Sequence, residues 1–461
     1  MDTKTQPPKS RQGRRALIVA LTLLPALLIL LLRPLDFTLQ QSAVLAALVL
    51  TILWWVTGAV ERTAASVFLL AVFLLISGAP AATVFSFPLS ENFVMIAVSF
   101  LFSQGISNSG LPGKLLQPLL DRFARTPLRM VAFLILSALI SMFIIPQPFS
   151  RIIILSLIFR EYFDRMGLSK ELSSALMFGL YFFSVLINMT MIRGDIILNG
   201  ALISMAGQSV SELTWVQYMA VPTLLFLLAA AALYWLLFRG RLRSFPVSAP
   251  AASGGKLSLE RGDVRNLIFL AAVVVVWATE DFHPVSGTIT VVVATALMFP
   301  LGLLRLRDWR SINLKLLVFL TAAFSIGGTL SACGVADRLF SLFLPIFPAE
   351  FSVAYVLVVL VTSVLLHTVL GSNITTMSVV VPGLMSIGAS VAPALPLMFI
   401  MCIAVCSQFV LPFHHVILLL GEGNRYYTTK EILRVGIPHT VLMFAAVLIF
   451  YLPWWNLIGA M

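Results

Sequence analysis

The sequence predicts an all-α integral membrane protein with about eleven transmembrane helices and two opposed re-entrant hairpins, arranged as an inverted-topology repeat. The composition supports a membrane setting, because 60% of the 461 residues are hydrophobic and 11% are charged, whereas soluble domains carry roughly 25% charged residues. The mean hydropathy is +1.02. The hairpins are predicted from two polar interruptions inside apolar stretches, residues 146–151 and 370–375. The repeat is predicted from their spacing, about 224 residues.

The chain begins with a basic tail and continues with apolar segments of about 20 residues, the length that crosses a bilayer. No small-residue cleavage site follows the first apolar run, so we expect an uncleaved first span with a cytoplasmic N-terminus. Residues 1–40 form this tail and first span, and residues 41–238 form the first repeat. The first four predicted spans are residues 16–33, 41–59, 63–80 and 92–110.

Charge positions the first predicted hairpin, residues 130–163. Arg129 precedes it and Arg165 follows it, so the positive-inside rule puts both ends in the cytoplasm. A pair of full spans would give the same charges, but the two arms, of about 16 and 12 residues, are short for that purpose. We therefore expect a hairpin that enters from the cytoplasm. The basic segment before it, residues 114–129, is expected to be a cytoplasmic loop.

A predicted broken helix completes the first repeat. Segment 171–206 is apolar but is interrupted at Arg193-Gly194-Asp195, and span 215–238 follows it. Residues 239–263 are rich in Arg, Pro, Ser and Gly, which is typical of a linker. We expect this linker to be cytoplasmic and to separate the two repeats.

The second repeat, residues 264–453, is predicted to follow the same plan in the opposite orientation. Its hairpin, residues 352–392, has no Lys or Arg at either end and is expected to enter from outside. An offset of 224 also pairs Ser107 with Ser331 and Gly110 with Gly334. The C-terminus is expected outside the cell. The remaining predicted elements are spans 264–279, 285–304, 314–332 and 432–453 and segment 394–421, which is broken at residues 412–415.

Several function classes are excluded by what the sequence contains. The net charge of +11 comes from Lys and Arg in short loops, where topology explains them, so we expect no nucleic-acid partner. Cys333, Cys402 and Cys406 lie in apolar segments without metal-ligand spacing. Neither a glycine-rich phosphate loop nor a His-Glu-x-x-His motif is present. We therefore expect no ATP-driven transport, no enzyme activity and no cofactor.

The two interruptions predict a ligand site. Backbone without helical hydrogen bonds is tolerated at membrane depth only where it is buried in protein or lines a wet cavity. Broken segments in corresponding halves of a membrane protein are typical of the binding site of a secondary transporter. We expect a small substrate to lie between the two hairpin tips and the two broken helices.

Two arginines inside apolar segments indicate an anionic substrate. A guanidinium at membrane depth costs about 2.5–3.5 kcal/mol on insertion scales, so such a residue is rarely without a function. Its planar fork suits carboxylate, sulfate or phosphate. We hypothesise that Arg151 and Arg193 bind the anion. The alternative is structural: Arg151 extends to the interface, and Arg193 pairs with Asp195 to hold the broken helix.

The polar residues of the breaks are candidates for binding the substrate or a coupling ion. Hydroxyls and free carbonyls at half-helix ends can coordinate a cation, although Ser or Asn there can also act as a helix cap. Histidine could carry a coupled proton or be a hydrogen-bonded core residue, and Asp195 could carry a proton or be a counter-ion. The substrate-binding candidates are Gln147, Ser150, Arg151, Arg193, Ser372, Asn373 and Thr375. The coupling candidates are Asp195, Asn199, Ser372, Asn373, Thr376, Pro412, His414 and His415.

Several motifs resemble the divalent anion/sodium symporters, which carry dicarboxylates, citrate or sulfate. Ser372-Asn373-Ile374-Thr375-Thr376, with Pro382 downstream, is similar to the Ser-Asn-Thr hairpin tip of that family. Residues 406–412, followed by Gly421-Glu422-Gly423, resemble its broken tenth helix. Asn199-Gly200 and residues 215–222 resemble the stretch that follows its broken fifth helix. In layout, the resemblance covers residues 41–453.

The resemblance implies an elevator-type carrier that works as a homodimer in the cell (inner) membrane. It also implies sodium sites, but the sequence departs from the family at the residues that form them. Residues 147–151 replace the first Ser-Asn-Thr motif, and residues 193–195 and 413–415 replace Gly-Thr-Pro-Pro-Asn runs. Sodium, proton, exchange or no coupling all stay open. The alternative functions are an uncoupled channel or a lipid-handling protein on the same fold, and a membrane-embedded transferase.

Overall fold

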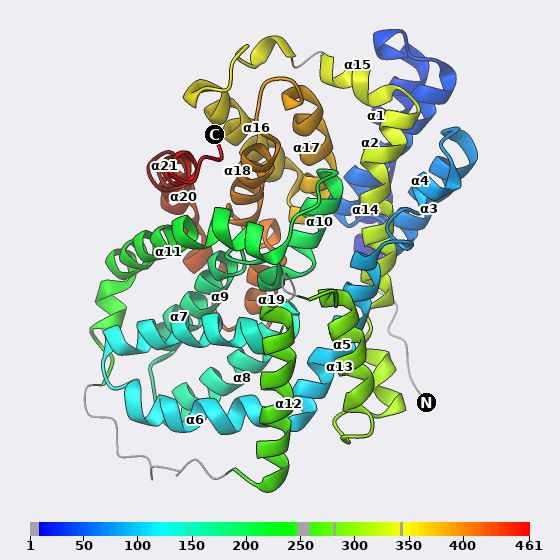
Figure 1. Cartoon of the computed structure of the whole chain (residues 1–461). Helices are drawn as coiled ribbons and strands as arrows, with labels where there is room; N and C mark the ends of the chain where they lie inside the picture. The colour runs from blue at the N-terminus through cyan, green and yellow to red at the C-terminus, as the bar shows by residue number, and fades with distance from the viewer. Residues whose placement is uncertain (1–8, 146, 247–258, 280–282, 342–343) are drawn as a thin grey trace.

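The computed structural model describes residues 9–145, 147–246, 259–279, 283–341 and 344–461, and in these ranges every regular element is a helix (Figure 1). The predicted all-α membrane fold is confirmed. Six described helices are long and apolar enough to cross a bilayer, or seven if one bent pair counts as a single span. A total of eleven spans would require helices shorter than 18 residues, such as α3, which has 15 residues, and this number stays a prediction.

The N-terminal helices begin and end where local capping groups predict. Thr38 and Gln41 form a capping box at the start of α2, and Ser90 accepts the N–H of Phe93 at the start of α5. Gly58, with φ of 64°, ends α2 in a left-handed turn that favours glycine. These elements are α1 (Lys9–Leu32), α2 (Leu39–Thr57), α3 (Arg62–Ile76), α4 (Ala81–Val84) and α5 (Glu91–Ser109), after a short turn η1 (Pro34–Asp36) between α1 and α2.

The segment predicted as a basic loop contains a helix, so that part of the prediction is wrong. Helix α6 (Leu111–Phe123) follows α5 directly and is bent from it by 58° at Gly110. Leu111 and Leu120 are buried, while Lys114 and Arg122 are exposed. The segment is thus amphipathic, and burial of its apolar residues stabilises a helix. From the sequence alone, its basic residues indicated a loop.

Both arms of the first predicted hairpin are helical and longer than expected. Helices α7 (Pro127–Ile144) and α8 (Pro148–Arg165) have 18 residues each, rather than about 16 and 12. Arm length therefore does not separate a re-entrant hairpin from two spans, and the re-entrant topology stays a prediction. The broken helix follows as α9 (Lys170–Ile187), η2 (Ile192–Asp195) and α10 (Leu198–Met205), and α11 (Glu212–Leu242) closes the repeat.

The second part of the chain repeats the order of elements. Gly334 has φ of 72° and its N–H bonds Ser331, as Gly110, with φ of 66°, bonds Ser107, so the pairs found by the offset share one backbone turn. That one repeat is inverted relative to the other stays a prediction. The elements are α12 (Arg261–Ala278), α13 (Gly287–Met298), η4 (Leu306–Ser311), α14 (Leu314–Ala332), α15 (Val335–Ser341), η5 (Leu344–Ile346), α16 (Val353–Leu370), α17 (Asn373–Gly388), α18 (Ala394–Cys406), η6 (Pro412–His414), α19 (Val416–Gly423), α20 (Thr429–Ala446), η7 (Val447–Tyr451) and α21 (Leu452–Leu457).

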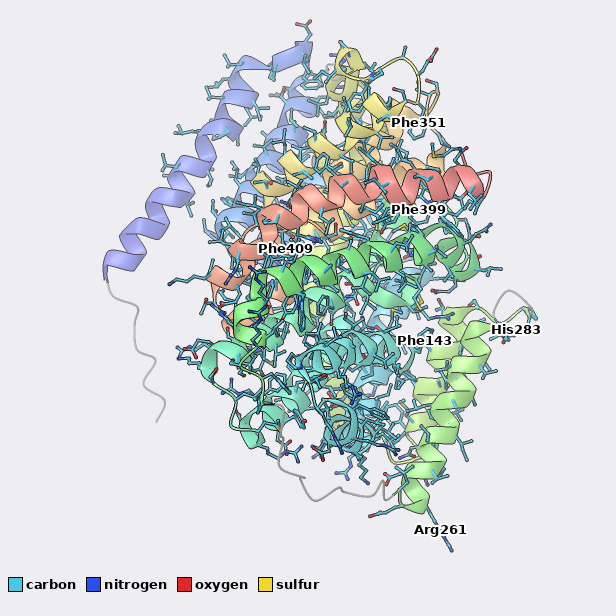
Figure 2. All side chains as sticks on the ribbon, turned by 90° about the vertical axis from the view of Figure 1, so that its left-hand side faces the viewer. Phe143, Arg261, His283, Phe351, Phe399 and Phe409 are labelled. Atoms are coloured by element: carbon cyan, nitrogen blue, oxygen red, sulfur yellow. The ribbon has the colours of Figure 1, made fainter. Side chains whose placement is uncertain are left out.

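Packing between the two halves is reciprocal. Helix α3 packs against α14, and α5 packs against α13, so each half supplies a partner for the other. Helices α11 and α20 also come from different halves, and they run side by side, as the green and salmon ribbons of Figure 2 show. The broken helices α9–α10 and α18–α19 lie among these elements, in the most buried part of the protein.

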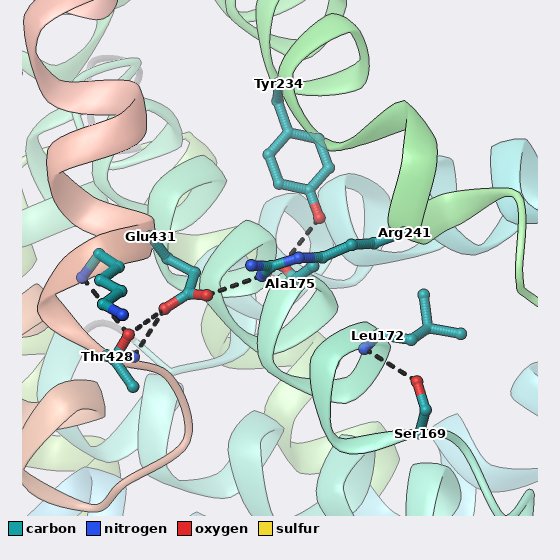
Figure 3. A network of polar contacts seen from close by, with 8 residues as sticks. Ser169, Leu172, Ala175, Tyr234, Arg241, Thr428 and Glu431 are labelled. Carbon is teal, nitrogen blue, oxygen red and sulfur yellow. Dashed lines mark hydrogen bonds and ion pairs between the residues drawn. The ribbon is translucent and has the colours of Figure 1, made fainter.

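A polar network joins the ends of α11 and α20 (Figure 3). Arg241 of α11 lies 2.7 Å from Glu431 of α20, and Glu431 also accepts the N–H and hydroxyl of Thr428. Tyr234 donates its hydroxyl to the carbonyl of Ala175 in α9 over 2.8 Å. These contacts connect α11 with α20 and with α9, the first half of a broken helix.

Candidate functional site

The two predicted interruptions meet at one cavity. Its volume is about 150 Å³, and it lies where the tips of the α7–α8 and α16–α17 hairpins approach both broken helices and the helices α2, α3 and α14. The lining is mostly apolar, with a few polar groups, as is usual for small-ligand sites. The lining residues are Trp55, Arg62, Phe149, Asp195, Ile197, Leu198, Leu316, Phe319, Leu370, Gly371, Ser372, Asn373, Ile374, Val416 and Leu419.

The second tip contributes two polar residues to the lining, Ser372 and Asn373. Gly371 ends α16 with φ of 63°, and Ser372 precedes the first turn of α17. Asn373 donates its side-chain amide to the carbonyl of Val405 over 2.7 Å, which joins this tip to the end of α18. Ser372 and Asn373 therefore lie on the cavity, at the amide end of a 16-residue helix. The helix dipole gives this end partial positive charge.

Two threonines predicted at the second tip lie behind the cavity wall. Thr376 shares a 2.9 Å hydrogen bond with the Nδ1 atom of His367 on the facing arm. Thr375 is buried, and its hydroxyl has no hydrogen-bond partner among the described residues. A buried hydroxyl without a partner costs free energy.

The first tip is built differently. Gln147 caps α8 by accepting the N–H of Ser150, and its amide nitrogen is buried without a described partner. Phe149 is the residue of this tip that lines the cavity, whereas Gln147 and Ser150 do not. Pro146 lies outside the described residues.

Arg151, predicted to bind the anion, is turned into the protein. The side chain is 2% exposed and donates to three oxygens: the carbonyl of Ile145 at 2.8 Å, Oδ1 of Asn188 at 2.6 Å, and the carbonyl of Gly194. It does not line the cavity, and it does not extend to the interface as the structural alternative expected. Three oxygens converging on one cation resemble the coordination of a bound metal ion. Arg151 thus joins the first tip to the first broken helix.

Arg193 does not line the cavity. Its Nε atom lies 3.8 Å from a carboxylate oxygen of Glu212, at the start of α11. Asp195 lines the cavity, whereas Arg193 does not, and the pair of Arg193 with Asp195 stays a prediction. Arg151 and Arg193 therefore have different partners, and neither of them lines the cavity.

Asp195 and Asn199 hold the first broken helix in shape. Asp195 accepts the N–H groups of Ile197 and Leu198 just before and at the start of α10, while its side chain also lines the cavity. Asn199 donates its amide to three backbone carbonyls of the break, at 2.9, 2.9 and 3.3 Å. Asp195 is thus a cavity residue and Asn199 a positioning residue.

Replacing Gly194 with alanine tests this packing. A Cβ atom at Gly194 would overlap the backbone carbonyl of Asn188, which cannot rotate away as a side chain could. We expect Gly194→Ala to lower the free energy of unfolding by about 1–3 kcal/mol, measured by thermal unfolding in detergent. Gly240→Ala is the control, because it adds a methyl group to α11 where no atom lies within 4 Å. Equal melting temperatures for the two variants would contradict the close approach.

The second broken helix uses histidines as caps. His414 accepts the N–H groups of Val410 and Leu411 through Nδ1, and His415 accepts the N–H of Ile417 at the start of α19. Pro412 begins the η6 turn, which ends at His414. None of these three residues lines the cavity, which Val416 and Leu419 of α19 reach instead.

Arg62 is the site residue that the sequence did not reveal. It begins α3, lines the cavity, and lies with its guanidinium carbon 5.0 Å from the centre of the Phe319 ring of α14. In the sequence it stands beside Glu61 at the head of a short apolar segment, which is indistinguishable from an ordinary loop charge. Only the packing of α3 against α14 brings it to the two tips.

The cavity therefore combines one cation, Arg62, one carboxylate, Asp195, and the polar tip Ser372–Asn373. Within the described ranges, no group of three His, Cys, Asp or Glu side chains could hold a metal ion. Such a site can bind a small anion through the guanidinium and the amide end of α17, with the carboxylate available for a proton or cation.

Comparison with known proteins identifies a protein family that matches this chain. The family model described as the sodium:sulfate symporter transmembrane region matches residues 14–461. A comparison with curated proteins found no match.

Proposed function

Because the chain belongs to the sodium:sulfate symporter family, a family of anion transporters, we propose that it is a secondary active carrier of small divalent anions such as sulfate or a dicarboxylate. The observation that carries the proposal is the cavity between the two helix breaks, with Arg62 and the amide end of α17 on its wall. These groups would hold the anion, and its movement with the hairpins past α3 and α14 would carry it across. By resemblance to this family, we also propose an elevator movement, a homodimer and a location in the cell (inner) membrane.

We further propose that Arg151 takes the place of a sodium ion at the first break. Its guanidinium donates to the carbonyls of Ile145 and Gly194 and to Asn188, which are the kinds of oxygen that coordinate sodium. A fixed cation removes the need for a bound one there. Transport would then depend on fewer sodium ions than in relatives with two Ser-Asn-Thr tips.

We propose that the remaining coupling site lies at the second tip. Thr375 presents a buried hydroxyl without a described partner, next to the Ser372–Asn373 turn. Asp195, which also lines the cavity, would carry a proton if sodium is not used.

The function is tested by uptake of labelled sulfate, succinate, citrate and phosphate into proteoliposomes, with and without sodium or proton gradients. Saturable uptake that an unlabelled anion competes supports the carrier. Flux that rises linearly with concentration and is not competed contradicts it and indicates a channel.

Thr375→Val separates the two coupling schemes. Valine keeps the shape of threonine, and no described hydrogen bond is lost, so we expect unfolding temperatures to be unchanged. If the hydroxyl coordinates sodium, the sodium concentration for half-maximal uptake should rise at least about 10-fold, in line with the loss of one ligand bond to a charged group. An unchanged sodium response together with lost pH dependence in Asp195→Asn would contradict the sodium assignment.

A further inference from the structure

A second cavity, an open groove between α6 and α7, shares no lining residue with the proposed anion site. Its volume is about 660 Å³. The two helices are neighbours, joined by a short turn, and Figure 1 shows them in cyan at the lower left. The wall is apolar and open to the surroundings: Leu119, Phe123, Leu136 and Ile140 are between 42% and 49% exposed. In a membrane such a wall faces acyl chains.

One end of this groove carries three arginines, Arg122, Arg125 and Arg129, all exposed. No ion pair joins them to a carboxylate in the part of the chain that the structure describes, since Asp121 nearby pairs with Arg165 at 3.9 Å. The Arg122 guanidinium lies over the Phe123 ring, 5.6 Å from its centre. Positive charge is thus concentrated at this end of the groove, where no ion pair among the described residues offsets it.

The dimensions of the groove match one lipid leaflet. From Arg129 to Ile140 the α7 helix advances about 16 Å at 1.5 Å per residue. Half the hydrocarbon core of a bilayer is about 15 Å. A headgroup held at the arginines would therefore leave an acyl chain alongside the apolar wall over the depth of its leaflet.

We propose that an anionic phospholipid binds in this groove, with its phosphate at Arg122, Arg125 and Arg129 and an acyl chain along Leu119, Leu136 and Ile140. Basic pockets between helices on the cytoplasmic side are typical of sites for anionic headgroups, and the sequence predicts a cytoplasmic location for these arginines. The lipid would contact α6, which continues from α5, and α7, which leads to the first tip. The bound lipid would stabilise the packing of α6 against α7.

The test uses the purified full-length protein in detergent, with phosphatidylglycerol added and phosphatidylcholine as the neutral lipid. Binding is measured by native mass spectrometry and by the rise in melting temperature. The variant is Arg122→Gln/Arg125→Gln/Arg129→Gln. We expect it to bind phosphatidylglycerol about 100-fold more weakly, since each basic residue near an anionic lipid contributes about fivefold.

The matched control is Arg305→Gln/Arg307→Gln/Arg310→Gln, which removes three exposed arginines from the η4 region. It should bind phosphatidylglycerol as the wild type does. Leu136→Trp, which fills the groove without changing charge, should weaken lipid binding even if the triple variant does not fold. Equal loss in both triple variants, or no loss in any, would overturn the proposal. So would stabilisation by inorganic phosphate equal to that by the lipid, because it indicates a site for a free anion.

Discussion

Arg62→Gln is expected to raise the substrate concentration for half-maximal uptake by about 10- to 100-fold. Arg62 is the one cationic side chain among the described residues that line the cavity between the tips. A hydrogen bond to a charged group contributes about 1.5–3 kcal/mol, and each 1.4 kcal/mol corresponds to a tenfold change in binding. The measurement is the initial rate of sulfate or succinate uptake as a function of concentration in proteoliposomes.

Three further variants make this result specific. Arg310→Gln removes an exposed arginine from η4 and should leave uptake unchanged. Arg62→Lys keeps the charge but loses the planar fork, so it should restore part of the affinity. Arg193→Gln should reduce uptake less than Arg62→Gln, because Arg193 faces Glu212 rather than the cavity. Normal uptake by Arg62→Gln would remove this residue from the proposed site.

Arg151→Ala is expected to lower the free energy of unfolding by about 3–5 kcal/mol, the usual effect of removing one partner from a buried charged cluster. The variant leaves the oxygens of Ile145, Asn188 and Gly194 without their donor, and it leaves Asp195 without the cation that faces it. If Arg151 takes the place of a sodium ion, sodium or guanidinium should restore part of the melting temperature. Thermal unfolding in detergent, with sodium and then with choline as the cation, measures both effects.

Arg165→Ala is the control on the same helix. Its side chain is 44% exposed and lies 3.9 Å from Asp121, a separation at which surface pairs contribute less than about 1 kcal/mol. A loss of stability in Arg151→Ala that neither cation reverses would leave Arg151 a structural tie and contradict its role as a built-in ion.

Most of the fold could be predicted from apolar segment length and turn residues. The span predicted at residues 314–332 coincides with α14, and the offset between Gly110 and Gly334 marked two turns with the same backbone conformation. Helix α6 could not be found in this way, because its basic residues were interpreted as topology signals. Positive charge in a short segment is compatible with either a loop or an amphipathic helix. Only the packing of this segment against α7 and α8 shows that it is a helix.

The sequence by itself determined that this is a helical membrane protein of the sodium:sulfate symporter family. It also determined that two apolar segments are interrupted by polar residues, about 224 residues apart. These properties depend on composition and on the local chemistry of helix ends. The tertiary structure alone decided which side chains face the cavity. Arg151 and Arg62 are the same residue type, yet one donates to three protein oxygens and the other lines the space between the tips. The direction of a side chain depends on helices distant in sequence, such as α14 beside α3, and no local pattern encodes it.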